Sequence, residues 1–218
     1  MTSGARLVML GRQGAGKGTQ CSRLAAHFGM PHISTGDMLR LAVADGTAFG
    51  KKANEFMAAG DLVPDEVMIG VVDERLHMED ARTQGYVLDG FPRTVAQAEA
   101  LADITDGALE MVVDLDVPTE VVLPRLAGRR VCRNCGTNYS VDEPPTSNWS
   151  CDVCGGEVVQ REDDKEEAIQ RRLDLYEEVT TPLTAWYAER DLLVVVDGMG
   201  EPDEVTARLL AAIDAKRG

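Results

Sequence analysis

The sequence predicts an α/β protein in which helices cover both faces of a parallel β-sheet. Apolar runs of strand length recur along the 218 residues, and helical patterns lie between them. The runs are continuous rather than alternating, which is typical of strands that are buried on both faces. They occupy residues 7–10, 86–88, 111–115 and 192–196. A chain of this length has room for one sizeable core and one or two small inserted modules.

The first apolar run leads directly into a glycine-rich loop and then into a helix. Residues 11–19 read Gly-Arg-Gln-Gly-Ala-Gly-Lys-Gly-Thr. Glycines let the backbone N–H groups of such a loop turn toward an anion, and the helix N-terminus adds a positive dipole end. Lys17 can place a mobile charge on β- and γ-phosphates. Gly18 stands where a Ser or Thr commonly holds Mg²⁺, and the hydroxyl follows at Thr19, so we expect water and substrate oxygens to hold most of the metal's coordination shell.

Two segments differ from the rest of the chain and are predicted to be insertions. Residues 34–63 are mostly helical and end at a Gly-Asp-Leu-Val-Pro stretch. Residues 128–164 carry paired cysteines, two adjacent prolines and a polar loop, which is typical of a small flap held by a metal. A long helix is expected over residues 165–190, where Pro182 kinks it or divides it in two.

Four of the five cysteines form two Cys-x-x-Cys pairs. Cys132 and Cys135 are separated from Cys151 and Cys154 by fifteen intervening residues. Four thiolates in this pattern give tetrahedral sulfur ligation, which suits Zn²⁺ and leaves no open position for a substrate. A reducing compartment disfavours disulfides between them. The fifth cysteine, Cys21, lies on the first predicted helix and is expected to be a small buried side chain.

The composition excludes several classes of partner. The chain has 37 acidic and 22 basic residues and a net charge of −15, which argues against nucleic acid or an anionic membrane. It has no apolar run near the ~18 residues of a membrane span and no recognisable secretory signal, so a cytoplasmic location is expected. With 17 arginines and only 5 lysines, the surface suits either a salt-rich cytoplasm or an ordinary acidic soluble protein.

A carboxylate and a set of arginines complete the candidate chemistry. Asp89 follows the apolar run 86–88, so it lies at the carboxyl edge of the sheet, where ligands bind in such folds. A carboxylate there can orient the water shell of Mg²⁺. Guanidinium groups clamp phosphates with two parallel hydrogen bonds, and arginines at the edges of a cleft in an acidic chain suggest this use. The candidate arginines are Arg40, Arg93, Arg125, Arg129, Arg161 and Arg172.

Together these motifs resemble the adenylate kinases, in their long-lid form with a zinc-held lid, within the nucleoside monophosphate kinase superfamily. The matching segments occur in order over essentially the whole chain, at residues 11–19, 33–40, 88–93, 128–131 and 161–164. The resemblance implies a three-layer P-loop fold with a five-stranded parallel sheet. It implies reversible, Mg²⁺-dependent conversion of ATP and AMP to two ADP by a monomer.

The same resemblance implies three domains and a set of site residues. The core comprises residues 1–33, 64–127 and 165–218, the AMP-binding domain residues 34–63, and the lid, with its zinc site, residues 128–164. The residues implied in catalysis are Lys17, Asp89, Arg93, Arg129, Arg161 and Arg172. ATP is expected to contact Gly14, Ala15, Gly16, Lys17, Gly18, Thr19, Arg125, Arg129, Asn138, Tyr139 and Gly200. AMP is expected to contact Thr35, Arg40, Asp61, Leu62, Val63, Gly90, Phe91, Pro92, Arg93, Gln97, Arg161 and Arg172.

Several alternatives stay open at this point. One is a kinase for UMP or CMP. Thr35 and Gln97 argue against it, because the pyrimidine nucleotide kinases resemble this chain but have Ala and Asn at the corresponding positions. A GTP-dependent AMP kinase is another. A zinc-ribbon NTPase that binds nucleic acid is permitted by the cysteines, but it is opposed by the acidic charge. Arg12 and Gln13 depart from the small residue and proline common in this loop of the family, so a positive charge is expected beside the ATP site.

Overall fold

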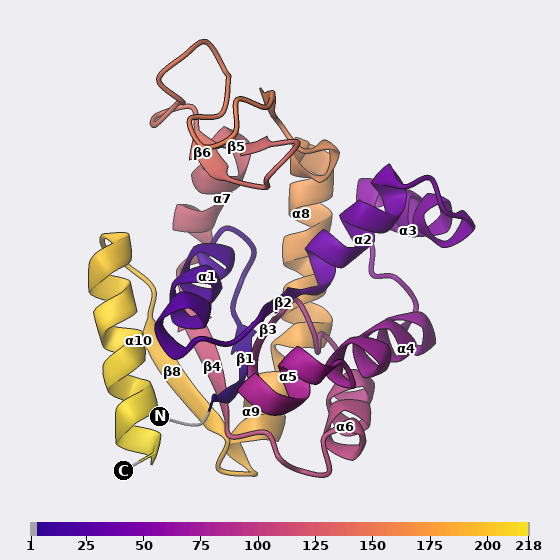
Figure 1. Cartoon of the computed structure of the whole chain (residues 1–218), viewed down its shortest axis with the longest axis vertical. Coiled ribbons are helices and arrows are strands. Elements are labelled where there is room, and N and C mark those ends of the chain that lie inside the picture. The colour runs from indigo at the N-terminus through magenta and orange to yellow at the C-terminus, as the bar shows by residue number, and fades with distance from the viewer. Residues whose placement is uncertain (1–3, 218) are drawn as a thin grey trace.

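A computed structural model describes residues 4–217, and within them the core is built on a parallel sheet of five strands. Neighbouring strands follow the order β2-β3-β1-β4-β8, with β1 in the centre (Figure 1). The predicted α/β class and five-stranded sheet are confirmed. The strands are β1 Arg6–Leu10, β2 His32–Ser34, β3 Tyr86–Asp89, β4 Met111–Asp116 and β8 Leu193–Asp197.

Both faces of this sheet are covered, because successive side chains of the central strands alternate between two cores. Leu7 and Met9 join one buried cluster, whereas Val8 and Leu10 join the other. The first cluster is completed from α1 Lys17–Phe28, α7 Thr119–Gly128, α8 Glu166–Leu175 and α10 Pro202–Arg217. The second is completed mainly from α4 Asp65–Leu76, α5 Glu79–Gln84, α6 Val95–Ile104 and α9 Pro182–Ala188.

The first predicted insertion is a helical hairpin of α2 Thr35–Ala44 and α3 Ala48–Ala59. Each helix begins at a side-chain cap: Ser34 Oγ accepts from the Asp37 amide at 3.2 Å, and Thr47 Oγ1 accepts from the Gly50 amide at 2.9 Å. A Cβ at Gly50 would collide with the Ala42 carbonyl, so a glycine is required where the two helices approach. Figure 1 shows this hairpin projecting from the carboxyl edge of the sheet.

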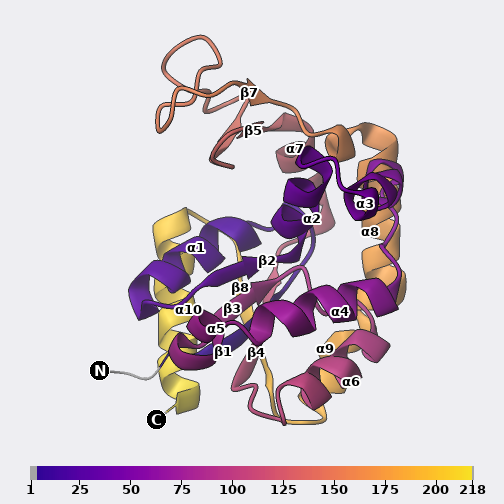
Figure 2. The same ribbon diagram turned by 45° about the vertical axis from the view of Figure 1, so that its right-hand side comes forward.

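The second predicted insertion is a three-stranded antiparallel sheet of order β6-β5-β7. Its strands are β5 Arg129–Cys132, β6 Asn138–Ser140 and β7 Val158–Val159. Its buried cluster contains only Cys132, Cys151 and Val158, with Tyr139 packed against them. In Figures 1 and 2 it stands apart from the core, on the same side as the α2–α3 hairpin. This segment has few buried apolar side chains, and two of the three residues in its buried cluster are cysteines.

The long helix expected after this segment is divided, as predicted. Residues Glu166–Leu175 form α8, and Tyr176–Thr180 form a wider π-helical turn. Pro182 then begins α9 at a first-turn position, where its missing N–H costs nothing. Pro182 has no N–H and cannot donate the hydrogen bond that would continue a regular α-helix, and the wider π-helical turn lies directly before it.

Candidate active site

A cleft of about 930 Å³ lies at the carboxyl ends of the central strands, between the core and the two insertions. The strand order reverses at β1, which has β3 on one side and β4 on the other. Open α/β sheets bind ligands at such a switch point, because the loops that follow the two neighbouring strands leave in opposite directions. The glycine-rich loop follows β1 and therefore forms the floor of the cleft.

The glycine-rich loop has the conformation that its sequence predicts. Gly14 and Gly16 have φ values of 81° and 97°, a region that other residues rarely adopt. A Cβ at Gly14 would also lie 2.9 Å from the Leu126 side chain. Lys17 Nζ donates to the carbonyls of Gly11 at 2.6 Å and Arg12 at 3.0 Å, so its ammonium is folded back over the loop. Burial lowers the pKa of Lys17 to about 8.

Asp89 occupies the position predicted for it, at the end of β3 beside the glycine-rich loop. The parallel register pairs Ser34 with Asp89, which brings β2 alongside the carboxylate. Burial alone would raise the pKa of Asp89, but nearby positive charge, including the Lys17 ammonium, lowers it below its ordinary value. Asp89 is therefore ionised at neutral pH and faces the cleft, as a group that orients Mg²⁺ must be.

Two of the predicted arginines are held by buried aspartates. Arg129 donates through Nε to Asp164 Oδ2 at 2.7 Å and through Nη2 to Asp164 Oδ1, which is a bidentate pair. Arg172 donates through Nη1 to Asp163 Oδ2 at 2.7 Å. The Asp164 side chain is completely buried. These pairs fix both guanidinium planes at the cleft wall before any ligand arrives.

Arg161 differs, because its guanidinium is poorly satisfied by the protein. Its Nε is buried and has no hydrogen-bond partner among the described residues. Burial, together with the charges of Arg40 and Arg129, lowers the pKa of Arg161 to about 10. An unpaired donor beside other cations costs free energy, and an anion in the cleft would relieve that cost. Arg93, in contrast, donates from Nε to the Gly90 carbonyl at 2.9 Å.

A small hollow of about 50 Å³ adjoins the cleft and is lined by many of the residues expected to hold AMP. Thr35 and Gln97 contribute to it, and both are buried. The Gln97 amide is oriented from two sides: Nε2 donates to Asp65 Oδ1 at 2.6 Å, and Oε1 accepts from the Arg93 amide at 2.7 Å. Asp65 also accepts from Thr94 Oγ1 at 2.7 Å.

Sequence reasoning missed Asp65, Asp163 and Asp164 as supports of the site. The only local signal near Asp65's partners was the Thr94-x-x-Gln97 spacing, a capping pattern that does place both side chains at the start of α6. Asp163 and Asp164 lay within a matched segment, but nothing in the sequence paired them with particular arginines.

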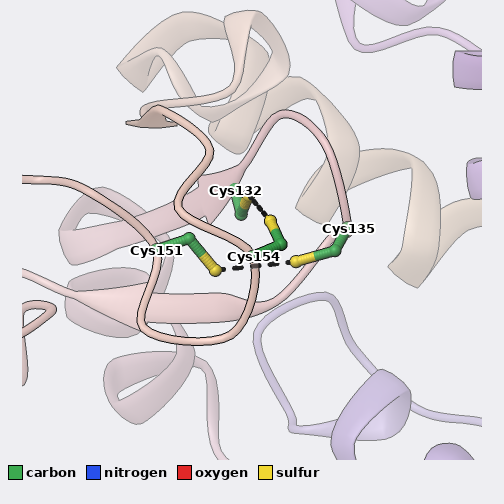
Figure 3. A group of neighbouring side chains, drawn as sticks. All are labelled: Cys132, Cys135, Cys151 and Cys154. Carbon is green, nitrogen blue, oxygen red and sulfur yellow. Dashed lines mark hydrogen bonds between the residues drawn. The ribbon is translucent and has the colours of Figure 1, made fainter.

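The four lid cysteines converge as predicted (Figure 3). Their sulfur atoms all lie within 4.8 Å of one another. Cys132 and Cys154 are 3.5 Å apart, and Cys135 and Cys151 are 3.6 Å apart, so none of these pairs is a disulfide. Tetrahedral Zn²⁺ with bonds of about 2.3 Å places its sulfurs about 3.8 Å apart, and the two closest sulfur pairs lie near this distance.

Some predicted residues lie elsewhere than the cleft surface. Gly200 is absent from the walls of both cavities, and Arg208 nearby donates to the Asp197 carbonyl at 2.6 Å. Phe91 and Ala15 are buried in the core, and Ala15 turns its side chain inward from the glycine-rich loop. Other predicted residues do line the cleft or hollow: Gly14, Gly16, Gly18, Thr19, Arg40, Asp61, Leu62, Val63, Gly90, Pro92, Arg93, Arg125, Asn138, Tyr139 and Arg172.

Two side chains are engaged in ways that the sequence did not suggest. The Tyr139 hydroxyl donates to Cys151 Sγ at 3.4 Å, so it supports the cysteine cluster while the residue lines the cleft. Arg12 turns away from the loop and donates to Glu177 at 2.8 Å and to the Val117 carbonyl at 3.3 Å. Its charge is therefore largely neutralised by Glu177, on the π-helical turn, rather than directed at the phosphate loop.

The fold and the site together define a nucleotide-binding protein of the phosphate-loop class. The family described as "Adenylate kinase" matches residues 9–192. The chain is 51% identical to an adenylate kinase of Geobacter sp. (strain M21), over 96% of this chain and 99% of that protein. It is 49% identical to one from Caldicellulosiruptor bescii, over 95% and 98% of the two chains, and 48% identical to one from Archaeoglobus fulgidus, over 95% and 97%. The chain belongs to the adenylate kinase family.

This membership confirms the expected class of enzyme, a phosphotransferase, and does not favour the pyrimidine-kinase or nucleic-acid-binding alternatives. Among residues 4–217, none of the helices combines the length and apolar character needed to cross a membrane.

Proposed function

We propose that this chain transfers the terminal phosphoryl group reversibly from Mg²⁺-bound ATP to AMP, giving two ADP. The observation that supports this most is the charge of the cleft. Eight cationic side chains line it within the described chain, against two carboxylates, in a protein of net charge −15. The cations are Lys17, Arg40, Arg93, Arg125, Arg129, Arg133, Arg161 and Arg172. A site built for two phosphate chains needs this concentration of positive charge.

The roles follow from the geometry around the glycine-rich loop. The backbone N–H groups of residues 14–19 and the N-terminus of α1 receive the ATP phosphates, and Lys17 leaves its two carbonyl partners for the transferred group. Bound Mg²⁺ would neutralise phosphate charge, with Asp89 orienting its water ligands. The acceptor phosphate of AMP is already an anion, so the residues need to align the two ends and supply no general base.

The arginines surround the point of transfer. Arg129 and Arg172 are held rigidly by Asp164 and Asp163, so little rotamer freedom is lost when phosphate oxygens bind. Arg161 has a free buried Nε, which supports a direct contact with the transferring group. Such preorganised donors stabilise charge that spreads over the phosphoryl oxygens in the transition state.

Gln97 supports AMP as the acceptor. An amide has two N–H donors and two oxygen lone pairs. Asp65 and the Arg93 amide use one of each and fix which end of the group is which. The remaining N–H and lone pair match the adjacent acceptor and donor on the Watson–Crick edge of adenine, at N1 and N6. Guanine and uracil present a carbonyl acceptor beside a ring N–H donor, the reverse order, and would leave these buried groups unmatched.

The two insertions then serve as movable covers, with residues 34–63 over AMP and residues 128–164 over ATP. Closure excludes water, which would otherwise accept the phosphoryl group. We propose Zn²⁺ at Cys132, Cys135, Cys151 and Cys154 as a structural centre of the ATP cover, because four thiolates leave no free coordination position. We further propose that the enzyme acts as a cytoplasmic monomer.

A coupled assay of the purified protein against AMP, CMP, UMP and GMP, with ATP or GTP as donor, tests the proposal. The specificity constant for ATP with AMP should exceed those of the other pairs. Lys17→Met should lower kcat by at least ~10²-fold, because it removes a preorganised charge from the transferred phosphate. Lys216→Met, on α10 and paired with Asp191 at 3.0 Å, is the matched control and should retain activity. Near-normal turnover in Lys17→Met would contradict the proposed role of the loop.

A further inference from the structure

A second group of metal-binding side chains lies outside the lid. Cys21 on α1, His32 on β2 and Asp89 on β3 place a sulfur, a nitrogen and an oxygen within 4.8 Å of one another. His32 Nε2 lies 3.5 Å from Asp89 Oδ2. In a tetrahedral zinc site with Zn–N and Zn–O bonds of about 2.1 Å, these two atoms would be about 3.4 Å apart. The spacing of the His32 and Asp89 atoms therefore fits a shared ion.

The imidazole has its metal-binding nitrogen free. Ser22 Oγ donates its proton to the Gly18 carbonyl at 2.9 Å, so at 3.3 Å it is placed to accept a hydrogen bond from His32 Nδ1. A proton on Nδ1 leaves the lone pair on Nε2. That atom is buried and has no hydrogen-bond partner among residues 4–217. A hydrogen bond to one ring nitrogen that orients the other is the usual arrangement around a histidine metal ligand.

We propose that Cys21, His32 and Asp89 form a second divalent-cation site, selective for Zn²⁺ over Mg²⁺, whose occupation inhibits phosphoryl transfer. Thiolate and imidazole are ligands that Zn²⁺ prefers and that Mg²⁺ avoids. One thiolate, one carboxylate and one neutral imidazole balance the two charges of the ion. Three protein ligands leave a fourth position for water or a phosphate oxygen.

Two of the three side chains of this site face the nucleotide cleft. His32 and Asp89 line the cleft wall, whereas Cys21 is completely buried behind them. An ion must therefore enter from the cleft, and bound ATP would hinder it. The nearby Lys17 ammonium repels a cation, so this site is expected to bind Zn²⁺ more weakly than the four lid cysteines do.

The inhibitory effect rests on the proposed function, because it follows from Asp89. A Zn²⁺ ion that holds the Asp89 carboxylate takes it away from the water shell of the Mg²⁺ bound with ATP. Inhibition by free Zn²⁺ should therefore be relieved by raising the concentration of Mg²⁺-bound ATP. Binding of the ion itself does not depend on the reaction and can be measured without any nucleotide.

The test uses the full-length protein with Zn²⁺ already in the lid. Co²⁺ titration, followed by the cobalt–thiolate charge-transfer band and by elemental analysis, should show one further ion per chain. Cys21→Ala should abolish that band. It should also raise the free Zn²⁺ concentration for half-inhibition by at least ~10-fold, since losing even an outer-shell partner of a metal costs ten- to hundredfold in affinity. His27→Gln, an exposed histidine on the same helix, is the matched control and should behave as the unmodified protein.

The outcomes separate this site from the proposed reaction. Equal Co²⁺ binding in the unmodified protein and in Cys21→Ala would overturn the site, whatever the activity. A site that binds Co²⁺ in a protein without AMP-dependent ADP formation would leave the site standing and refute the function. One that binds without inhibiting an active enzyme would overturn the inhibitory role. If Cys21→Ala does not fold, Cys21→Ser and His32→Gln should each give the same loss of the extra ion.

Discussion

The ion pair between Arg129 and Asp164 should be strongly coupled, because one partner is completely buried. The Asp164 side chain has no exposed surface, and that of Arg129 is 19% exposed. Asp164→Ala would leave a guanidinium without its carboxylate at the base of the lid. Removing one partner of a buried pair costs about 3–5 kcal/mol. A chain of this size loses about 2–4 °C in melting temperature per kcal/mol, so we expect a fall of about 6–20 °C.

A double-mutant cycle measures that coupling directly. Thermal and urea unfolding of Asp164→Ala, Arg129→Ala and the double variant should give a coupling free energy above about 2 kcal/mol, because the double variant no longer contains a buried unpaired charge. The pair of Arg171 and Asp61 is the control, at 2.8 Å but with side chains 52% and 41% exposed. Exposed pairs contribute at most about 1 kcal/mol. Equal coupling in the two cycles would refute the reasoning from burial.

Three further predictions concern single groups. Because burial lowers the pKa of Lys17 to about 8 and bound phosphate must raise it again, ATP affinity should fall as pH rises above 8, with proton uptake measurable by calorimetry in buffers of different ionisation heat. Asp65→Ala should free the Gln97 amide to rotate and raise KM for AMP by about 10-fold, the effect of one lost hydrogen bond to a charged group, with little change in KM for ATP. Cys151→Ser should lower the zinc content and melting temperature and increase the share of ATP lost to water.

Each of these has a control and a contrary result. Lys17→Arg keeps its charge at high pH. If ATP affinity in that variant fell with rising pH as it does in the unmodified protein, the pH dependence would not come from Lys17. Asp73→Ala, on the same helix as Asp65, should leave KM for AMP unchanged; a rise equal to that in Asp65→Ala would indicate general disturbance of α4. Full activity and stability in a metal-free protein would end the structural role of zinc.

The sequence predicted the parts of the fold that rest on local patterns. Four of the five strands of the core sheet are continuous apolar runs; β1, β3 and β4 are largely buried on both faces, whereas the edge strand β8 leaves Val195 60% exposed. The fifth, β2, is only three residues long, and Ile33 is its one buried side chain, so no run marks it. The resemblance to a family supplied that strand, and the parallel pairing of β2 with β3 bears it out.

In the candidate site, too, the features that rest on local sequence patterns were predicted and the others were not. The glycine-rich loop, Asp89 and the cysteine pairs were predictable, since each motif is carried by a few neighbouring residues. Contacts between distant positions were not. Asp65 meets Gln97 across 32 positions, and Arg129 meets Asp164 across 35. The packing of α4 on α6 brings the first pair together, and the packing of α7, which ends just before Arg129, on α8, which begins just after Asp164, brings the second. Gly200, a position carried over from the family, lies outside the cleft walls of this structure.

These distant carboxylates explain how an acidic protein keeps so many cations in one cleft. Without ligand, Asp37, Asp163 and Asp164 hold Arg40, Arg172 and Arg129 in fixed directions and limit their mutual repulsion. Arg161 has a buried Nε without a hydrogen-bond partner among the described residues, and burial and neighbouring cations lower its pKa to about 10, as burial also does for the paired Arg172. Under the proposed function, a phosphate oxygen that reached Arg161 would meet an unpaired donor, whereas at Arg129 or Arg172 it would share the guanidinium with an aspartate.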